Sequence, residues 1–109
     1  MSETSPRLEQ LKEFLEESPN DSFILFAIAK EYEGLGATDL ALSFYKKLVE
    51  VEPDYVGTYY HLGKLYDAMD DVELALQTYA IGMEVARKMG DHHALSELAG
   101  AKLNLEFEM

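Results

Sequence analysis

The residue types that usually carry chemistry are present in this sequence, but their spacing fits no catalytic or metal-binding pattern. The chain has three histidines and no cysteine. His92 and His93 are adjacent, so on a helix their side chains point about 100° apart and cannot hold one metal ion together. His61 lies far from both in the sequence. No nucleophile motif and no glycine-rich phosphate loop after a strand is present. We therefore expect no catalytic residue, no metal site and no cofactor, and we do not expect an enzyme.

The net charge of the chain argues against two classes of partner, nucleic acids and anionic membranes. There are 21 acidic residues against 9 basic ones, for a net charge of −12. Nucleic acids and anionic membrane surfaces both require a basic surface, so neither is an expected partner. Two explanations of the acidic excess remain open. It can keep a small protein dispersed in solution, or it can form a surface that recruits basic partners.

Length and hydropathy predict one soluble domain in the cytoplasm. A chain of 109 residues is the size of a single domain, and without cysteine it has no disulfide framework. No apolar run approaches the roughly 18 residues that a membrane-spanning helix needs. The first six residues are polar and acidic, unlike the basic and then apolar segments of a signal peptide.

The elements that would position any functional residue come from an internal repeat. Residues 22–53 align with residues 56–87 without a gap, so the offset between the two copies is constant. The matched pairs include Leu25 with Tyr59, Ile28 with Leu62, Ala29 with Gly63, Tyr32 with Tyr66, Ala41 with Ala75, and Tyr45 with Tyr79. A fixed period of this size is the signature of stacked helical units.

Apolar residues at helical spacing and capping residues predict six antiparallel helices joined by short turns. Ser5 and Pro6 are expected to begin the first helix, and either Asn20 or Asp21 the second. Gly34 and Gly36 should end the second helix, and the third should begin at Ala37 or Thr38 and close at Pro53.

The second half of the chain has its own start and stop signals. We expect Asp54 to cap the fourth helix and Asp70 to cap the fifth, with Glu73 completing a capping box. Arg87 stands where a proline would close the repeat, so the fifth helix is expected to continue to Lys88 or Met89. Gly90 should end it, and Asp91 should cap the last helix.

This pattern resembles the tetratricopeptide repeat, a unit of about 34 residues that reads W-x2-L-G-x2-Y, then A-x3-F, then P. The second copy reads Tyr59-x2-Leu62-Gly63-x2-Tyr66, then Ala75-x3-Tyr79, and the first copy ends at Pro53. The resemblance implies an all-α fold, an α-solenoid of antiparallel helix pairs. We expect a single domain over residues 1–109, with an N-terminal half-repeat at 5–18, full repeats at 20–53 and 54–90, and a C-terminal capping helix at 91–106.

Small residues within the repeat predict where helices approach closely. Gly82 stands where the first copy has Leu48, and a glycine inside a helix costs about 0.5–1 kcal/mol. We therefore expect a close contact between Gly82 and the last helix. That helix is expected to use Leu95, Leu98 and Leu103 to cover an apolar end of the second repeat. The residues that it should cover include Leu74 and Ile81.

In the family that the chain resembles, the first helix of each repeat lines a concave groove that binds peptides. The resemblance implies a set of eight partner-binding residues here: Phe23, Phe26, Lys30, Glu33, Tyr60, His61, Lys64 and Asp67. Recurrence at the repeat period should place the two aromatics in one column and the two lysines in another. A basic groove in an acidic chain favours a ligand with a carboxylate near an apolar side chain. In the alternative, Phe26 and Tyr60 pack partly against helices and the lysines face solvent.

Some members of this family hold a chaperone's acidic C-terminus with lysines, asparagines and an arginine. Here the matching positions in the two repeats hold Phe26, Lys30 and His61, so that ligand is not expected. A peptide of mixed apolar and charged character fits better. The predicted function is an adaptor that binds a protein or peptide partner in the groove. The alternative is structural self-association, in which the last helix packs on its own copy in a symmetric dimer. The predicted state is thus a monomer or a weak homodimer.

Overall fold

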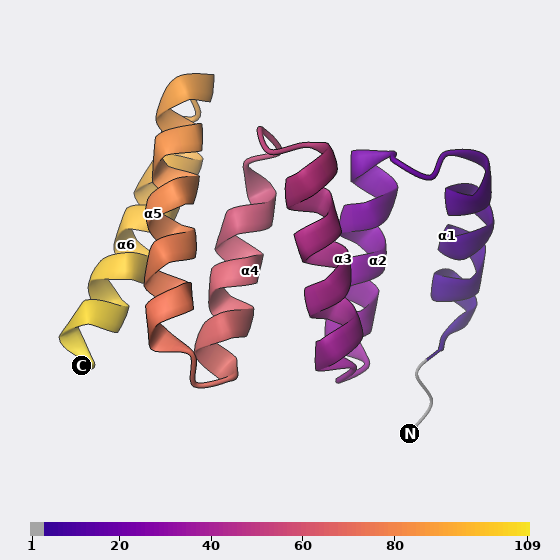
Figure 1. The fold of residues 1–109 in the computed structure, drawn as a ribbon, viewed down its shortest axis with the longest axis horizontal. Coiled ribbons are helices and arrows are strands. Elements are labelled where there is room, and N and C mark those ends of the chain that lie inside the picture. The colour runs from indigo at the N-terminus through magenta and orange to yellow at the C-terminus, as the bar shows by residue number, and fades with distance from the viewer. Residues whose placement is uncertain (1–3) are drawn as a thin grey trace. The chain divides into compact units, whose positions relative to one another are not determined.

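The computed structural model describes residues 4–109, and this part of the chain contains six α-helices and no strand (Figure 1). The helices are α1 (Pro6–Glu17), α2 (Ser22–Gly34), α3 (Thr38–Val51), α4 (Gly57–Ala68), α5 (Val72–Met89) and α6 (His92–Phe107). The all-α helical-repeat fold is thus confirmed. Residues 1–3, which belong to the polar segment that is unlike a signal peptide, lie outside the described part.

The helices fall into two compact units, Met1–Glu52 and Pro53–Met109. In the first unit, α2 and α3 lie side by side as an antiparallel pair, and α1 packs against α2 (Figure 1). The residues that share the repeat positions form the core of this pair. They are Leu25, Ile28, Ala29, Ala41, Tyr45 and Leu48, all fully buried.

The helix starts in the first unit follow their capping residues. The N–H of Leu8 donates to the Ser5 hydroxyl at 3.0 Å, and Pro6 occupies the first helical position, where its missing N–H is not needed. Asp21, not Asn20, caps α2 by accepting from the Ile24 N–H at 3.0 Å.

In the second unit, α4 pairs with α5, and α6 packs against α5 and also contacts α4. Two glycines allow this close packing. A Cβ built on Gly63 would lie 2.3 Å from the Tyr79 ring, and one built on Gly82 would lie 2.5 Å from Tyr59 Cβ and 3.1 Å from Leu98 Cδ1. The expected contact between Gly82 and the last helix is confirmed, and α4 shares it.

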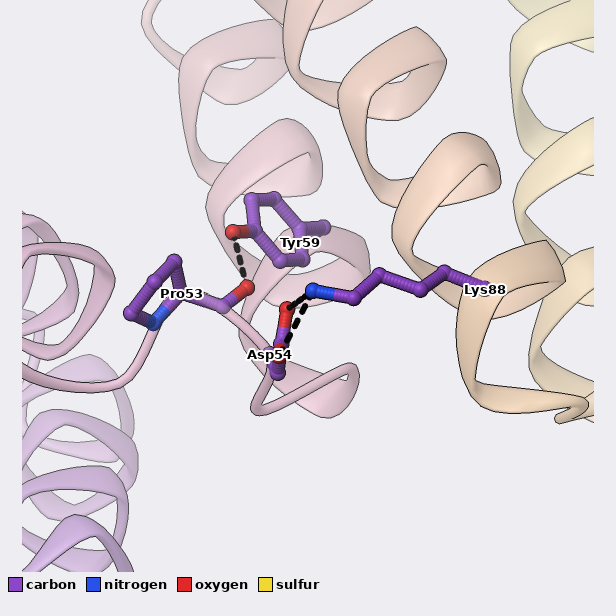
Figure 2. Close-up of polar contacts among 4 residues, drawn as sticks. All are labelled: Pro53, Asp54, Tyr59 and Lys88. Atoms are coloured by element: carbon purple, nitrogen blue, oxygen red, sulfur yellow. Dashed lines mark hydrogen bonds and ion pairs between the residues drawn. The ribbon is translucent and has the colours of Figure 1, made fainter.

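Asp54 does not cap α4, so that expectation is wrong. The helix begins only at Gly57, after a turn in which the Thr58 and Tyr59 N–H groups donate to Tyr55 and Val56. Figure 2 shows the other use of Asp54: its carboxylate accepts from Lys88 Nζ, at the end of α5, at 3.0 and 3.1 Å. The same turn is held by the Tyr59 hydroxyl, which donates to the Pro53 carbonyl (Figure 2).

The expected capping box at Asp70 and Glu73 is also wrong, by one residue. Asp70 adopts a left-handed conformation, with φ of 61°, and Asp71 caps α5 by accepting from the Leu74 N–H at 3.1 Å. Asp70 occupies the repeat position of Gly36, which has φ of 77°. The repeat therefore needs a left-handed residue here to end its first helix, and aspartate tolerates that conformation better than most residues.

The last two helices agree with their expected boundaries but not with all the expected contacts. α5 runs to Met89 and ends at Gly90, whose φ of 70° is left-handed, and Asp91 caps α6. Leu98 is buried, but Leu103 is 54% exposed, and Ile81 is 55% exposed with α6 in place. Leu98 and Leu103 point about 140° apart on a helix. The last helix therefore covers Gly82 and not Ile81, and Leu103 takes no part in that contact.

Candidate partner-binding site

The predicted groove residues of the first unit lie on α2 and differ in how far they are engaged. Phe23 is 67% exposed, and Lys30 is also exposed. Phe26 is half-buried, with its ring edge-on to that of Tyr45 at 6.2 Å between centroids. The Tyr45 hydroxyl donates to the Glu33 carboxylate, so Glu33 is tied to the core of the α2–α3 pair. Phe26 and Glu33 thus serve the packing of this unit, while Phe23 and Lys30 are available to a partner.

The second unit contains a cavity of about 340 Å³ between α4, α5 and α6. Three of the four groove residues predicted on α4 line it, namely Tyr60, Lys64 and Asp67. The remaining lining residues are Tyr79 on α5 and Ser96, Glu97, Gly100, Ala101, Asn104, Leu105 and Glu108 on or just after α6. His61 does not line the cavity, and its ring lies edge-on to Tyr60 at 5.6 Å. A volume of this size lies in the range of small ligand sites, large enough for one or two side chains of a partner.

The charges in this cavity differ from the basic groove expected from Lys64. One lysine faces three carboxylates, those of Asp67, Glu97 and Glu108. Lys64 itself is exposed at the rim, and Asp67 is half-buried. The carboxylates favour a basic group in the ligand, while Lys64 can still orient an acidic or carbonyl oxygen.

Tyr79 forms the floor of the cavity as a neutral group. Its side chain is almost fully buried. Burial, the nearby Asp67 carboxylate and Tyr60 together raise the pKa of Tyr79 to about 12. Its hydroxyl therefore stays protonated around neutral pH and contributes no negative charge.

None of the α6 residues that line this cavity is among the partner-binding residues predicted from the sequence. The α5 helix continues to Met89, past Val85, which is the repeat equivalent of the last residue of α3, Val51. The constant offset between the repeats therefore does not carry into α6. A signal was nevertheless present, because Glu97, Ala101, Asn104 and Glu108 recur at spacings of four, three and four positions, which places them on one helical face.

A second depression, of about 570 Å³, lies on α3 alone. It is lined by Asp39, Leu42, Ser43, Lys46, Lys47 and Glu50. It is lined by one helix only and by no aromatic side chain, so a partner would find no ring to pack against there. The exposed Lys46 on this face is a suitable control for Lys64.

Metal-binding and membrane-spanning features are both absent from residues 4–109. No group of three or more histidine, cysteine, aspartate or glutamate side chains in this part is arranged to hold a metal ion. None of its six helices is both long and apolar enough to cross a membrane.

Comparison with known proteins gives one family and one fold. Residues 24–55 and 56–88, together more than half of the chain, match the model of the tetratricopeptide repeat. A TPR repeat-containing protein from Pseudomonas aeruginosa is 28% identical over 91 residues, which cover 84% of this chain and 87% of that protein.

Solved structures of tetratricopeptide repeat proteins have the same fold. The solution structure of a tetratricopeptide repeat domain protein from Salinibacter ruber is 50% identical, with a TM-score of 0.78, over 81% of this chain and 89% of that one. The TPR2B domain of yeast Sti1, solved as a complex with pHsp70, has a TM-score of 0.86 at 16% identity, over 94% of this chain and 82% of that one. At that identity the second likeness concerns the fold alone.

Proposed function

We propose that this chain, which belongs to the tetratricopeptide repeat family, is an adaptor that binds an extended segment of a partner protein. Domains of this family and fold typically act as non-enzymatic protein-interaction modules. The yeast Sti1 domain with this fold was solved in complex with pHsp70, which supports the suitability of the fold for holding a partner segment. The proposed compartment is the cytoplasm, which agrees with a chain that contains no cysteine.

The observation that carries the proposal is the cavity between α4 and α6. It combines a half-buried aromatic ring, Tyr60, with charges of both signs and a polar wall that includes Asn104. Such a combination binds a segment of mixed apolar and charged character. An apolar side chain of the partner packs on Tyr60 and contributes most of the affinity by burial. A neighbouring basic side chain pairs with Glu97 or Asp67, and Lys64 orients a carbonyl or carboxylate oxygen.

Phe23, Phe26, Lys30 and Glu33 on α2, and His61 on α4, are proposed as further contacts of the partner outside this cavity. Phe23 is the most accessible of the aromatic groups at these positions. Because Phe26 and Glu33 also engage Tyr45, their replacement is expected to lower stability as well as binding.

Selection from a random peptide library displayed on phage tests the proposal without knowledge of the partner. Peptides selected on the wild-type protein are expected to share an apolar residue next to a basic one, together with an acidic residue that pairs with Lys64. Their affinity should fall by about tenfold or more with Tyr60→Ala or Lys64→Glu, and should stay unchanged with the matched control Lys46→Glu on α3. If the selected peptides bind all three variants as tightly as the wild type, the α4–α6 cavity is not the binding site.

Self-association, the other candidate function, has support of its own. Four apolar residues of α6 that do not line the cavity recur every four positions and form an apolar ridge: Leu95, Ala99, Leu103 and Phe107. A dimer formed through this ridge would use none of the residues that line the cavity as its main contacts.

A further inference from the structure

The last helix is apolar on two sides. One side, with Leu98 and Leu105 buried, packs on the second unit. The other side carries Leu95, Ala99, Leu103 and Phe107, each four positions after the one before. Leu103 is 54% exposed and Phe107 is 81% exposed, while Leu95 and Ala99 are partly exposed. A helix that is apolar on both sides is typical of one that is covered on both sides.

These four residues form a ridge of the kind that packs against another helix. Side chains four positions apart make one of the two rows that interlock when helices cross, and the row of one helix can pack beside the same row of a second at about −50°. The smallest member, Ala99, lies within the ridge between two leucines. It leaves room for two backbones to approach where the helices cross, with the larger side chains on either side of that point.

We propose that this ridge binds the same ridge of a second copy of the chain, with the two α6 helices antiparallel about a twofold axis at Ala99. In that arrangement, residues equally far before and after Ala99 lie at the same height along the pair. Leu95 of each copy then lies level with Leu103 of the other. Every contact away from the axis occurs twice, as in any isologous interface.

A polar pairing of a histidine with a carboxylate supports a second copy as the occupant and favours the antiparallel direction. His92 and Glu106 lie at equal distances before and after Ala99 in the sequence, and each lies within about 20° of Ala99 around the helix axis. Antiparallel pairing therefore places each Glu106 level with His92 of the other copy, where an imidazole N–H can donate to the carboxylate. Parallel pairing would instead bring the two Glu106 carboxylates together. Within its own chain Glu106 is held by Lys102, whose Nζ lies 3.1 Å from the carboxylate, so it stays along the edge of the ridge.

The net charge of the chain sets the conditions in which this pairing is seen. Two copies of charge −12 repel each other at long range, and salt screens that repulsion. An interface held mainly by an apolar ridge should therefore be tighter at higher salt, the opposite of an interface held by surface ion pairs.

Sedimentation equilibrium of the full chain tests the proposal directly. Between about 10 µM and about 1 mM, the mass of the wild type is expected to rise from 12.3 kDa toward twice that value. Leu103→Glu should weaken the association by about tenfold or more. Ile81→Glu is the matched control, because Ile81 is 55% exposed but lies on α5, and it should associate like the wild type. A wild type that stays monomeric over this range overturns the proposal, and so does a dimer that Leu103→Glu leaves intact or that both variants break.

Mixing two charge variants tests the antiparallel register. His92→Glu alone should be more monomeric than the wild type, because it places two carboxylates together twice, and so should Glu106→Lys alone, because it removes the carboxylate that accepts from His92 at both places. Mixed in equal amounts, they should form a heterodimer, since Glu at position 92 of one copy then faces Lys at position 106 of the other. A mixture that associates no better than its two components rules out this register. Far-UV circular dichroism of each variant confirms that the helices remain folded.

Discussion

The ring of Tyr79 lies directly against the α-carbon of Gly63, so close that a methyl group at position 63 would come within 2.3 Å of the ring. This contact sets the distance between α4 and α5. The equivalent residues of the first repeat are Ala29 and Tyr45, both fully buried. The α2–α3 pair therefore has room for the methyl group of Ala29, whereas the α4–α5 pair has no room for a methyl group at position 63. Tyr79 is also the floor of the proposed binding cavity, so this packing contact and the site share one residue.

The first prediction concerns this contact. Gly63→Ala should destabilise the protein by about 1–2 kcal/mol, because overpacking outweighs the roughly 1 kcal/mol that alanine gains over glycine in a helix. Gly100→Ala is the matched control: Gly100 is also inside a helix, but a Cβ there meets nothing within 4 Å. It should stabilise the protein by about 0.5–1 kcal/mol. Urea unfolding measures both. Equal stability of the two variants would mean that Tyr79 does not press on Gly63.

The second prediction concerns which side of α6 belongs to the core. Leu98→Ala removes a buried side chain that contacts Gly82 and should cost about 2–5 kcal/mol. Leu103→Ala removes an exposed side chain of the same type from the same helix, and should change the free energy of unfolding by about 0.5 kcal/mol or less. Thermal and urea unfolding should be followed at the lowest protein concentration that gives a signal, so that association does not contribute. Similar losses in both variants would contradict the orientation of α6.

The third prediction concerns alkaline pH. The pKa of Tyr79 is raised to about 12, first by burial and then by Asp67 and Tyr60, whereas an unfolded tyrosine titrates near about 10. Between these values the unfolded chain has lost the proton and the folded chain still holds it. Stability is therefore full below pH of about 10 and falls as the pH rises toward about 12.

Tyr79→Phe removes this titration and should make the fall in the free energy of unfolding less steep over that range, while Tyr45 and Tyr59, whose pKa values are also raised by burial, keep contributing to it. Tyr66→Phe provides a comparison at a tyrosine that is only partly buried. An unfolding free energy that falls equally steeply in Tyr79→Phe and in the wild type would exclude a contribution of Tyr79 to the pH dependence.

The repeat period explains how much of this fold could be predicted from sequence. Matching Tyr45 with Tyr79 and Ala41 with Ala75 was sufficient to predict both helix pairs, because packing residues must recur whenever the same pair of helices recurs. The period also predicts the left-handed conformation of Asp70, because Asp70 lies one full period after Gly36. Capping preferences taken alone suggested a helix start there. The need for a left-handed residue at the end of the preceding helix decided the conformation instead.

The α6 wall of the cavity could not be predicted in the same way. No third copy of the repeat is present for alignment, and the longer α5 shifts the register of the helix after it. Which side of α6 faces the core is a matter of tertiary packing, since Leu95, Leu98, Leu103 and Leu105 give apolar residues on both sides. The structure resolves this by burying Leu98 and Leu105. Asn104 and Glu97 are thereby directed to the cavity, where they join Tyr60 and Lys64.

The most direct measurement of the central claim is an NMR titration of the ¹⁵N-labelled full chain with a library-selected peptide. The proposed function predicts that the amide signals that shift most belong to the residues lining the cavity, including Tyr60, Lys64 and Asp67 on α4 and Glu97 and Asn104 on α6. Signals of Lys46 and its neighbours on α3 should stay in place, and Lys64→Glu should weaken the shifts without altering the spectrum of the free protein elsewhere. Shifts that concentrate on α3, or that spread over both units and persist unchanged in Lys64→Glu, would contradict the account.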